Sequence, residues 1–293
     1  MGSEVVTQEP LARAAFQEAD DAIGFALSQL CFDGPADQLE LTEYAQPAIL
    51  TTSVALWRVL YARTGLRPLA VAGHSLGEWT ALVVAGAIGF ADAVRAVHER
   101  GRLMQEAVAV GEGAMAALLG TDLPTVNRLC ASAARGDVLA PANLNGGGQI
   151  VVAGHAAAVD RLLVAAKEQR IRAQKLAVSA PFHCALMAPA AVGLDAFLAA
   201  VTFRAPELPI ISSVAARPVQ CADELRPLLV EQVTAPVRWE ETMHALRTAA
   251  PEVALEIGPG QALRGLFKRA VPDVPVVGVS DLGGLAAATA AVQ

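Results

Sequence analysis

The apolar positions of this chain repeat with a helical period over most of its length and form short continuous runs elsewhere. Near the amino terminus, the apolar residues of segment 8–30 fall close to helical spacing and predict one amphipathic helix. A second helix is predicted over residues 47–62, with Pro47 in its first turn. Further helices are predicted over 92–108, 184–200, 223–232, 240–249 and 260–270. Short apolar runs near 69–72, 209–214, 253–257 and 275–279 alternate with these helices. The alternation predicts an α/β protein with a mostly parallel sheet covered on both faces.

The middle of the chain breaks this alternation. An apolar run at 114–119 precedes a helix at 122–134, and two short strands follow over 138–152 around Asn145-Gly146-Gly147-Gly148, a hairpin signal. A helix at 156–169 and a strand at 171–178 complete the order β-α-β-β-α-β, which is that of a ferredoxin-like unit. We therefore expect a small subdomain over 111–180, inserted in a large one formed by 1–110 and 181–293.

One short segment carries a catalytic pattern. Gly73-His74-Ser75-Leu76-Gly77 lies between the apolar run at 69–72 and a helical apolar stretch. A serine between two glycines at a strand-turn-helix junction is typical of a nucleophile elbow, which exposes the serine hydroxyl. We expect both glycines to be needed, because Cβ atoms there would clash. Backbone N–H groups at the start of the helix would stabilise an oxyanion.

A nucleophilic serine needs a base, and one histidine is well placed to supply it. The histidines are His74, His98, His155, His183 and His244. His74 adjoins the serine, and neighbours in a turn point apart, whereas His98 and His244 fall inside predicted helices. His183 follows a predicted strand and begins a helix, where the sites of α/β sheets assemble. Arg100, on the next helix after the elbow, is either a solvated charge or, if buried, a clamp for a substrate carboxylate.

Composition and charge narrow the class of protein. The chain has 293 residues, of which 54% are hydrophobic, enough for a large core. The apolar run at 81–87 is too short to span a bilayer, and residues 1–19 lack a signal pattern. The four cysteines have no metal-binding spacing and suggest free thiols in the cytoplasm. A net charge of −7 disfavours nucleic acid and requires a local basic patch for any acidic partner.

Five motifs follow one another in order along nearly the whole chain. They are Gly73-His74-Ser75-Leu76-Gly77-Glu78, Arg100-Gly101 with Met104-Gln105, Gly113-Ala114-Met115-Ala116, Ala180-Pro181-Phe182-His183-Cys184-Ala185-Leu186-Met187 and Glu256-Ile257-Gly258-Pro259-Gly260. Together they resemble the malonyl-CoA:acyl carrier protein transacylase family, which includes the acyltransferase domains of polyketide synthases. The resemblance implies an α/β-hydrolase-like core with a ferredoxin-like small subdomain.

The resemblance also implies roles for single residues. Ser75 would be the acylated nucleophile, His183 its base and acid, and the Leu76 N–H an oxyanion donor. Arg100 would grip the malonyl carboxylate, and the main-chain carbonyl of Gln232 would orient the histidine. Residues of the substrate site would be Phe182, His74 and Asn145, with Asn143 nearby. A phenylalanine before the histidine goes with malonyl rather than methylmalonyl in the polyketide branch.

The implied partners are malonyl-CoA and an acyl carrier protein. The resemblance also implies that the protein is a monomer and uses no cofactor and no metal. Carrier proteins are acidic, so docking would use a basic cluster. There are two candidates, which we call the 167–175 cluster and the 264–269 cluster. The first is Lys167, Arg170, Arg172 and Lys175, and the second is Arg264, Lys268 and Arg269. Either is equally well read as a solvated face.

The sequence departs from the family pattern at its start. Relatives begin with a strand and a Gly-Gln-Gly loop, followed by a Met-Gly that Met1-Gly2 matches here. We therefore expect the native protein to be longer, with the start assigned to an internal methionine. Trp79 stands where relatives often carry tyrosine, and we expect little consequence from this difference.

Two other functions stay open at this point. A thioesterase or other acyl hydrolase on the same scaffold would transfer the acyl group to water. A catalytically inactive scaffold protein would transfer no acyl group at all. The pattern does not separate a fatty-acid from a polyketide pathway.

Overall fold

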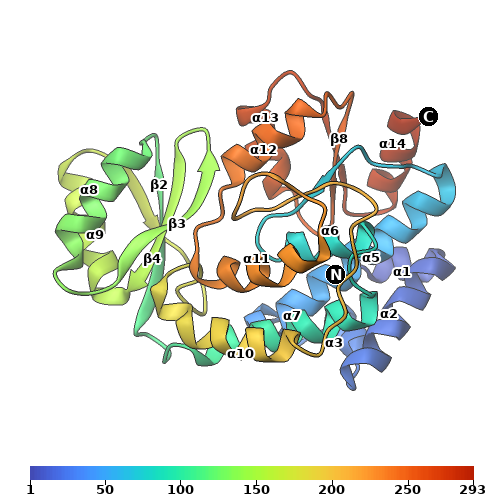
Figure 1. The fold of residues 1–293 in the computed structure, drawn as a ribbon, viewed down its shortest axis with the longest axis horizontal. Helices are drawn as coiled ribbons and strands as arrows, with labels where there is room; N and C mark the ends of the chain where they lie inside the picture. Colours follow the sequence, from blue (N-terminus) through green and yellow to red (C-terminus); the bar gives the residue numbers. More distant parts are fainter.

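The computed structural model describes residues 1–293 as a mixed α/β fold. Figure 1 shows two parts side by side: a lobe built around β2, β3 and β4, and a larger, mainly helical part that holds both termini. Each part has a hydrophobic core of its own, with 39 buried residues in the main cluster of the larger part and 13 in that of the lobe.

The first part of the chain is helical. Its helices are α1 (Ser3–Gln8), α2 (Pro10–Ile23), α3 (Leu27–Asp33), α4 (Ala36–Glu40) and α5 (Thr42–Thr64). The single helix predicted over 8–30 is wrong, because Gly24 takes a left-handed backbone with φ 83° and ends α2. Helix α5 begins at Thr42, so Pro47 lies inside it rather than in its first turn. Packing of α5 against α2 and α7 outweighs the backbone hydrogen bond that the proline removes.

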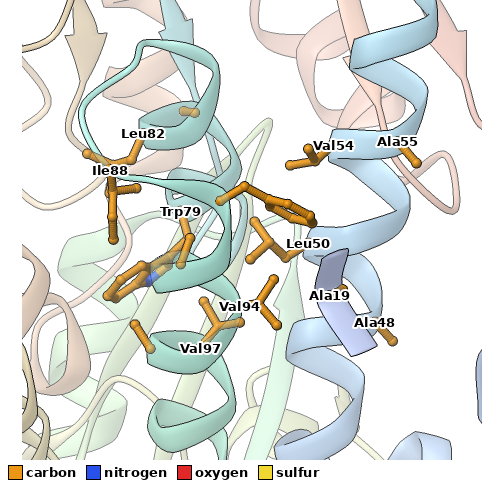
Figure 2. Packing of buried hydrophobic residues seen from close by; sticks show 14 of the residues in the cluster. Ala19, Ala48, Leu50, Val54, Ala55, Trp79, Leu82, Ile88, Val94 and Val97 are labelled. Atoms are coloured by element: carbon orange, nitrogen blue, oxygen red, sulfur yellow. The ribbon is translucent and has the colours of Figure 1, made fainter. Parts of the chain in front are cut away.

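Three helices of the larger part pack closely together (Figure 2). They are α5, α6 (Gly77–Val84) and α7 (Phe90–Glu106). Trp79 and Leu82 of α6 pack into the same cluster as Leu50 of α5 and Val94 of α7. Trp79 is fully buried, and its indole N–H has no hydrogen-bond partner. This packing fixes the start of α6 relative to α7, and so fixes Ser75 relative to Arg100.

The lobe follows the predicted order of elements. It contains β2 (Gly113–Leu119), α8 (Leu123–Ala134), β3 (Leu139–Gly146), β4 (Gln149–His155), α9 (Ala156–Glu168) and β5 (Arg172–Lys175). Its strands pair in the order β3-β4-β2-β5, every pair antiparallel. Both helices bury apolar residues, Leu129 of α8 and Leu162 of α9 among them, in one cluster with the sheet. Asp122 caps α8 by accepting a hydrogen bond from Thr125 N at 2.9 Å.

The larger part contains two short sheets. β1 (Val71–Ala72) runs parallel to β6 (Ile210–Ile211), which pairs antiparallel with β7 (Pro218–Val219), and β8 (Ala254–Ile257) runs parallel to β9 (Val276–Val279). The other elements are η1 (Ala185–Met187), α10 (Ala188–Leu198), α11 (Ala222–Thr234), α12 (Trp239–Thr248), α13 (Ala262–Ala270) and α14 (Leu282–Val292).

The predicted parallel pairing is present, but the single continuous sheet is not, since β1 and β8 lie in separate sheets. The apolar run at 209–214 pairs at only two positions. From Ser212 the chain folds back, and Ala216 N donates to Ser212 O at 2.8 Å. None of the helices combines the length and the apolar character that crossing a membrane requires.

Candidate active site

The turn between β1 and α6 holds Ser75 in a strained backbone conformation, with φ 50° in the left-handed region. Gly73 is obligatory, because a Cβ atom there would lie 1.8 Å from the carbonyl carbon of Gly77. Gly77 differs, since a Cβ atom on it would meet nothing within 4 Å. The expectation that both glycines avoid a clash is therefore wrong for Gly77, which simply begins α6.

His183 lies against this serine. Its Nε2 is 2.8 Å from Ser75 Oγ, and its Nδ1 is 2.8 Å from the main-chain oxygen of Gln232. Because a carbonyl oxygen only accepts, Nδ1 carries the proton, and Nε2 accepts the hydrogen bond of the serine hydroxyl. His183 is also left-handed, with φ 60°, so the fold holds both residues of the pair in sparsely populated conformations.

The surroundings keep His183 in its basic, neutral form. The side chain is 4% exposed. Burial, reinforced by the nearby positive charge of Arg100, lowers the pKa of His183 to about 3. At neutral pH the imidazole is therefore unprotonated and free to take the serine proton.

Arg100 is buried rather than solvated, at 2% exposure. Its Nη2 donates to Ser75 Oγ at 2.9 Å and to Gln232 Oε1 at 3.0 Å, and its Nη1 donates to Gln46 Oε1 at 2.6 Å. Burial lowers the pKa of Arg100 to about 10, which leaves the guanidinium charged at neutral pH. All its partners are neutral oxygens, and its Nε–H is buried without a partner. The guanidinium thus retains both charge and a donor for an incoming carboxylate.

The lobe reaches this site through β3. His74 Nε2 lies 2.9 Å from Asn145 Oδ1, and its ring packs against Trp239 at 5.6 Å between centroids. His74 is thus engaged with Asn145 and Trp239, which agrees with its dismissal as the base. Asn143 lies two residues earlier and forms a backbone bridge with Val237. Phe182 is half-buried and packs against the apolar cluster that contains Cys184.

The candidate oxyanion donor lies at the start of α6. Leu76 is the N-cap residue of this helix, and its N–H makes no hydrogen bond to another backbone carbonyl. Such an N–H, beside the nucleophile and at the positive end of a helix dipole, is suited to a developing negative charge.

Three polar residues of the site were not predicted as functional. Gln46 holds Arg100, while Glu78 and Ser213 form a buried network with Gln232. Glu78 is 4% exposed, and burial raises the pKa of its carboxyl group. Its sequence signal was available, because a charged residue opens the otherwise apolar stretch after the elbow. Gln46 and Ser213 lie far from the motif in sequence and carry no comparable signal.

The titratable side chains form no metal-binding group. No three His, Cys, Asp or Glu side chains gather closely enough to hold an ion. The four cysteines form no disulfide; Cys31, Cys130 and Cys184 are buried, and Cys221 is exposed.

Comparison with known proteins identifies relatives over almost the whole chain. The model of the acyl transferase domain family matches residues 1–284. Malonyl CoA-acyl carrier protein transacylase of Escherichia coli K12 is 44% identical over 289 residues, which cover 98% of this chain and 94% of that protein. The Bacillus subtilis 168 protein of the same name is 43% identical over 96% of this chain and 89% of its own length.

Solved structures agree with these relatives. The malonyl CoA-acyl carrier protein transacylase of Coxiella burnetii superposes with a TM-score of 0.97 at 39% identity, covering 100% of this chain and 93% of that one. A malonyl-transacylase in complex with its type II polyketide acyl-carrier protein gives a TM-score of 0.96 at 42% identity, covering 99% and 94%.

Proposed function

The chain belongs to the acyl transferase family, and on that premise we propose that it transfers the malonyl group of malonyl-CoA to the thiol of an acyl carrier protein. The names of the relatives support this substrate and this acceptor. The observation that carries the proposal is a single hydroxyl, Ser75 Oγ, that lies within 2.9 Å of both a neutral imidazole and a buried guanidinium.

In the first half-reaction, Ser75 Oγ attacks the thioester carbonyl carbon of malonyl-CoA while His183 Nε2 takes its proton. The Leu76 N–H stabilises the oxyanion that forms on the carbonyl oxygen. The carbonyl of Gln232, bonded to Nδ1, stabilises the imidazolium in the way that a carboxylate does in a triad. The carbon–sulfur bond then breaks, and His183 returns the proton to the leaving coenzyme A thiolate.

In the second half-reaction, the phosphopantetheine thiol of the carrier protein gives its proton to His183 and attacks the carbonyl carbon of the acyl-serine. The ester bond to Ser75 breaks, and His183 reprotonates the serine oxygen. The two half-reactions share one base and one nucleophile, so the kinetics are ping-pong.

Arg100 selects the acyl group in this scheme. Its Nη2 exchanges the serine hydroxyl for the malonyl carboxylate, and the unpartnered Nε–H supplies a second donor for a bidentate pair. Gln46 and Gln232 hold the guanidinium through neutral oxygens that do not compete as charges. Phe182 fills the space that an α-methyl group would need, which discriminates by about 10–200-fold at most.

The lobe contributes the other wall of the site. We read segment 111–180 as a ferredoxin-like subdomain inserted in an α/β-hydrolase-like core, an assignment supported by its strand order and antiparallel pairing. Asn145 on β3, bonded to His74, joins the two parts beside the nucleophile. In this proposal the protein acts as a monomer and uses no cofactor; malonyl-CoA is its substrate.

Intact-mass measurement after mixing the protein with malonyl-CoA tests this function. We expect a malonyl adduct that digestion locates on the peptide containing Ser75. The Ser75→Ala variant is the matched control and gains no mass. A wild-type protein that stays unmodified contradicts the proposal, and an adduct on another residue contradicts the assignment of Ser75.

A further inference from the structure

A second buried charge lies in the site and has no part in the chemistry above. Glu78 is 4% exposed and Arg100 is 2% exposed, so each would be costly to bury alone. No salt bridge joins them. Gln232 stands between them, because its side-chain amide contacts both groups.

The amide of Gln232 fits this place in only one orientation. Its Oε1 accepts from Arg100 Nη2 at 3.0 Å, and its Nε2 donates to Glu78 Oε2 at 2.6 Å. A guanidinium only donates hydrogen bonds, and an ionised carboxylate only accepts them. A flipped amide would place donor against donor and acceptor against acceptor. The carboxylate of Glu78, together with the main-chain oxygen of Ser75, which accepts from the same Nε2 at 3.3 Å, therefore determines which end of the amide faces Arg100.

Glu78 is itself fixed by the fold. Besides Gln232, its Oε2 accepts from Ser213 N at 3.2 Å and from Ser213 Oγ at 2.6 Å. Three donors converge on this single oxygen, an arrangement suited to a negative charge. Ser213 follows β6, and Glu78 lies in the first turn of α6. The hydrogen bonds of Glu78 therefore connect these two elements to Gln232.

We propose that Glu78 is a positioning residue that acts through the amide of Gln232 to hold Arg100, and that its charge balances Arg100 until a substrate carboxylate arrives. The proposal rests on the proposed function, in which Arg100 binds the malonyl carboxylate. It deepens that function by assigning the strength of carboxylate binding to a residue that touches neither the substrate nor the reacting atoms.

Removing the charge and removing the bridge then have opposite effects. In Glu78→Gln the side-chain oxygen still accepts all three hydrogen bonds, so Gln232 stays in place while Arg100 loses its counter-charge. We expect the KM for malonyl-CoA to fall about three- to tenfold relative to the KM for acetyl-CoA. In Gln232→Met the main-chain carbonyl that holds His183 remains, but the bridge is lost. We expect the preference for malonyl-CoA over acetyl-CoA to fall by about tenfold or more.

Glu256→Gln is the matched control. The carboxylate of Glu256 also accepts two N–H groups, from Leu263 at 2.9 Å and Arg264 at 2.8 Å, but it caps α13 outside the Gln232 network. This variant should lose stability without any change in substrate preference. The inference is overturned if Glu78→Gln leaves the KM for malonyl-CoA unchanged or raises it.

A second measurement does not depend on activity. Urea unfolding of wild type, Glu78→Gln, Arg100→Ala and the double variant forms a thermodynamic cycle. If Glu78 balances Arg100, the loss from Glu78→Gln is smaller once Arg100 is absent. Additive losses overturn the inference even when Ser75 is malonylated. Coupled losses in a protein that malonyl-CoA does not acylate would support the Glu78–Arg100 pairing while refuting the proposed function. If Glu78→Gln does not fold, Gln232→Met decides, and an unchanged malonyl preference in that variant overturns the inference.

Discussion

Replacing Arg100 with alanine tests the selection of the acyl group. The change removes the guanidinium from a site where Ser75 Oγ and two glutamine oxygens are its partners. It leaves the Ser75–His183 contact and the His183–Gln232 contact in place. The variant therefore separates recognition of the carboxylate from the chemistry of acyl transfer.

The expected loss follows from the burial of Arg100. Removing one partner of a buried ion pair costs about 3–5 kcal/mol, and we take the lower figure. Since about 1.4 kcal/mol corresponds to a factor of ten, about 3 kcal/mol corresponds to about a hundredfold loss. Only the reaction with malonyl-CoA should slow by this factor, because the acetyl group has no carboxylate for Arg100 to bind.

The assay is a competition between malonyl-CoA and acetyl-CoA for one holo carrier protein, followed by mass measurement of the acyl product. Arg102→Ala is the control, because Arg102 lies two residues along α7 and pairs at the surface with Glu99 and Glu106. We expect the control to keep the malonyl preference. An Arg100→Ala protein that also keeps it refutes the role of Arg100 as the carboxylate clamp.

Three other predictions follow from the site. The apparent pKa of the acid limb of kcat/KM should lie well below the ordinary histidine value of about 6.5. Burial lowers the pKa of His183 to about 3, so the base stays neutral as the pH falls. An apparent pKa near 6.5 would contradict this. In chemical denaturation, Gly73→Ala should unfold the protein or lower its stability by several kcal/mol, whereas Gly77→Ala, at the first position of α6, should leave its stability equal or higher. Equal losses of stability in the two variants would contradict the predicted clash at Gly73. Charge reversal of the 264–269 cluster should raise the carrier-protein KM at low salt more than reversal of the 167–175 cluster, because Arg269 lies against Gly147 of the hairpin that carries Asn145, while Lys175 is paired with Asp160. The opposite ranking contradicts this placement.

The catalytic pair could be predicted because each residue is marked by its local sequence. Ser75 lies in a strand-turn-helix pattern, and His183 lies in the sequence between a predicted strand and a predicted helix, so the sequence indicates both residues without their contact. The sequence does not decide whether Arg100 is a carboxylate clamp or a solvated charge, because only its burial in the fold separates the two. Gln232 was identified through the family resemblance alone.

The rest of the site depends on contacts that local patterns do not encode. Gln46 and Ser213 reach Arg100 and Glu78 from positions 54 and 135 residues away in sequence. The same limit applies to the fold. The break of the first helix at Gly24 is a single left-handed residue inside a regular apolar pattern, and Pro47 is tolerated inside α5 only because of tertiary packing. The order of elements in the lobe was predictable, because its glycine hairpin and the cap at Asp122 are local signals.

The most direct test of the central claim is a single-turnover chase. The protein is malonylated with malonyl-CoA, freed of coenzyme A and mixed with holo carrier protein. The account predicts that the malonyl group leaves Ser75 and appears on the phosphopantetheine thiol at the same rate. Release of free malonate with the carrier protein left unmodified would contradict it and would assign the site to a hydrolase.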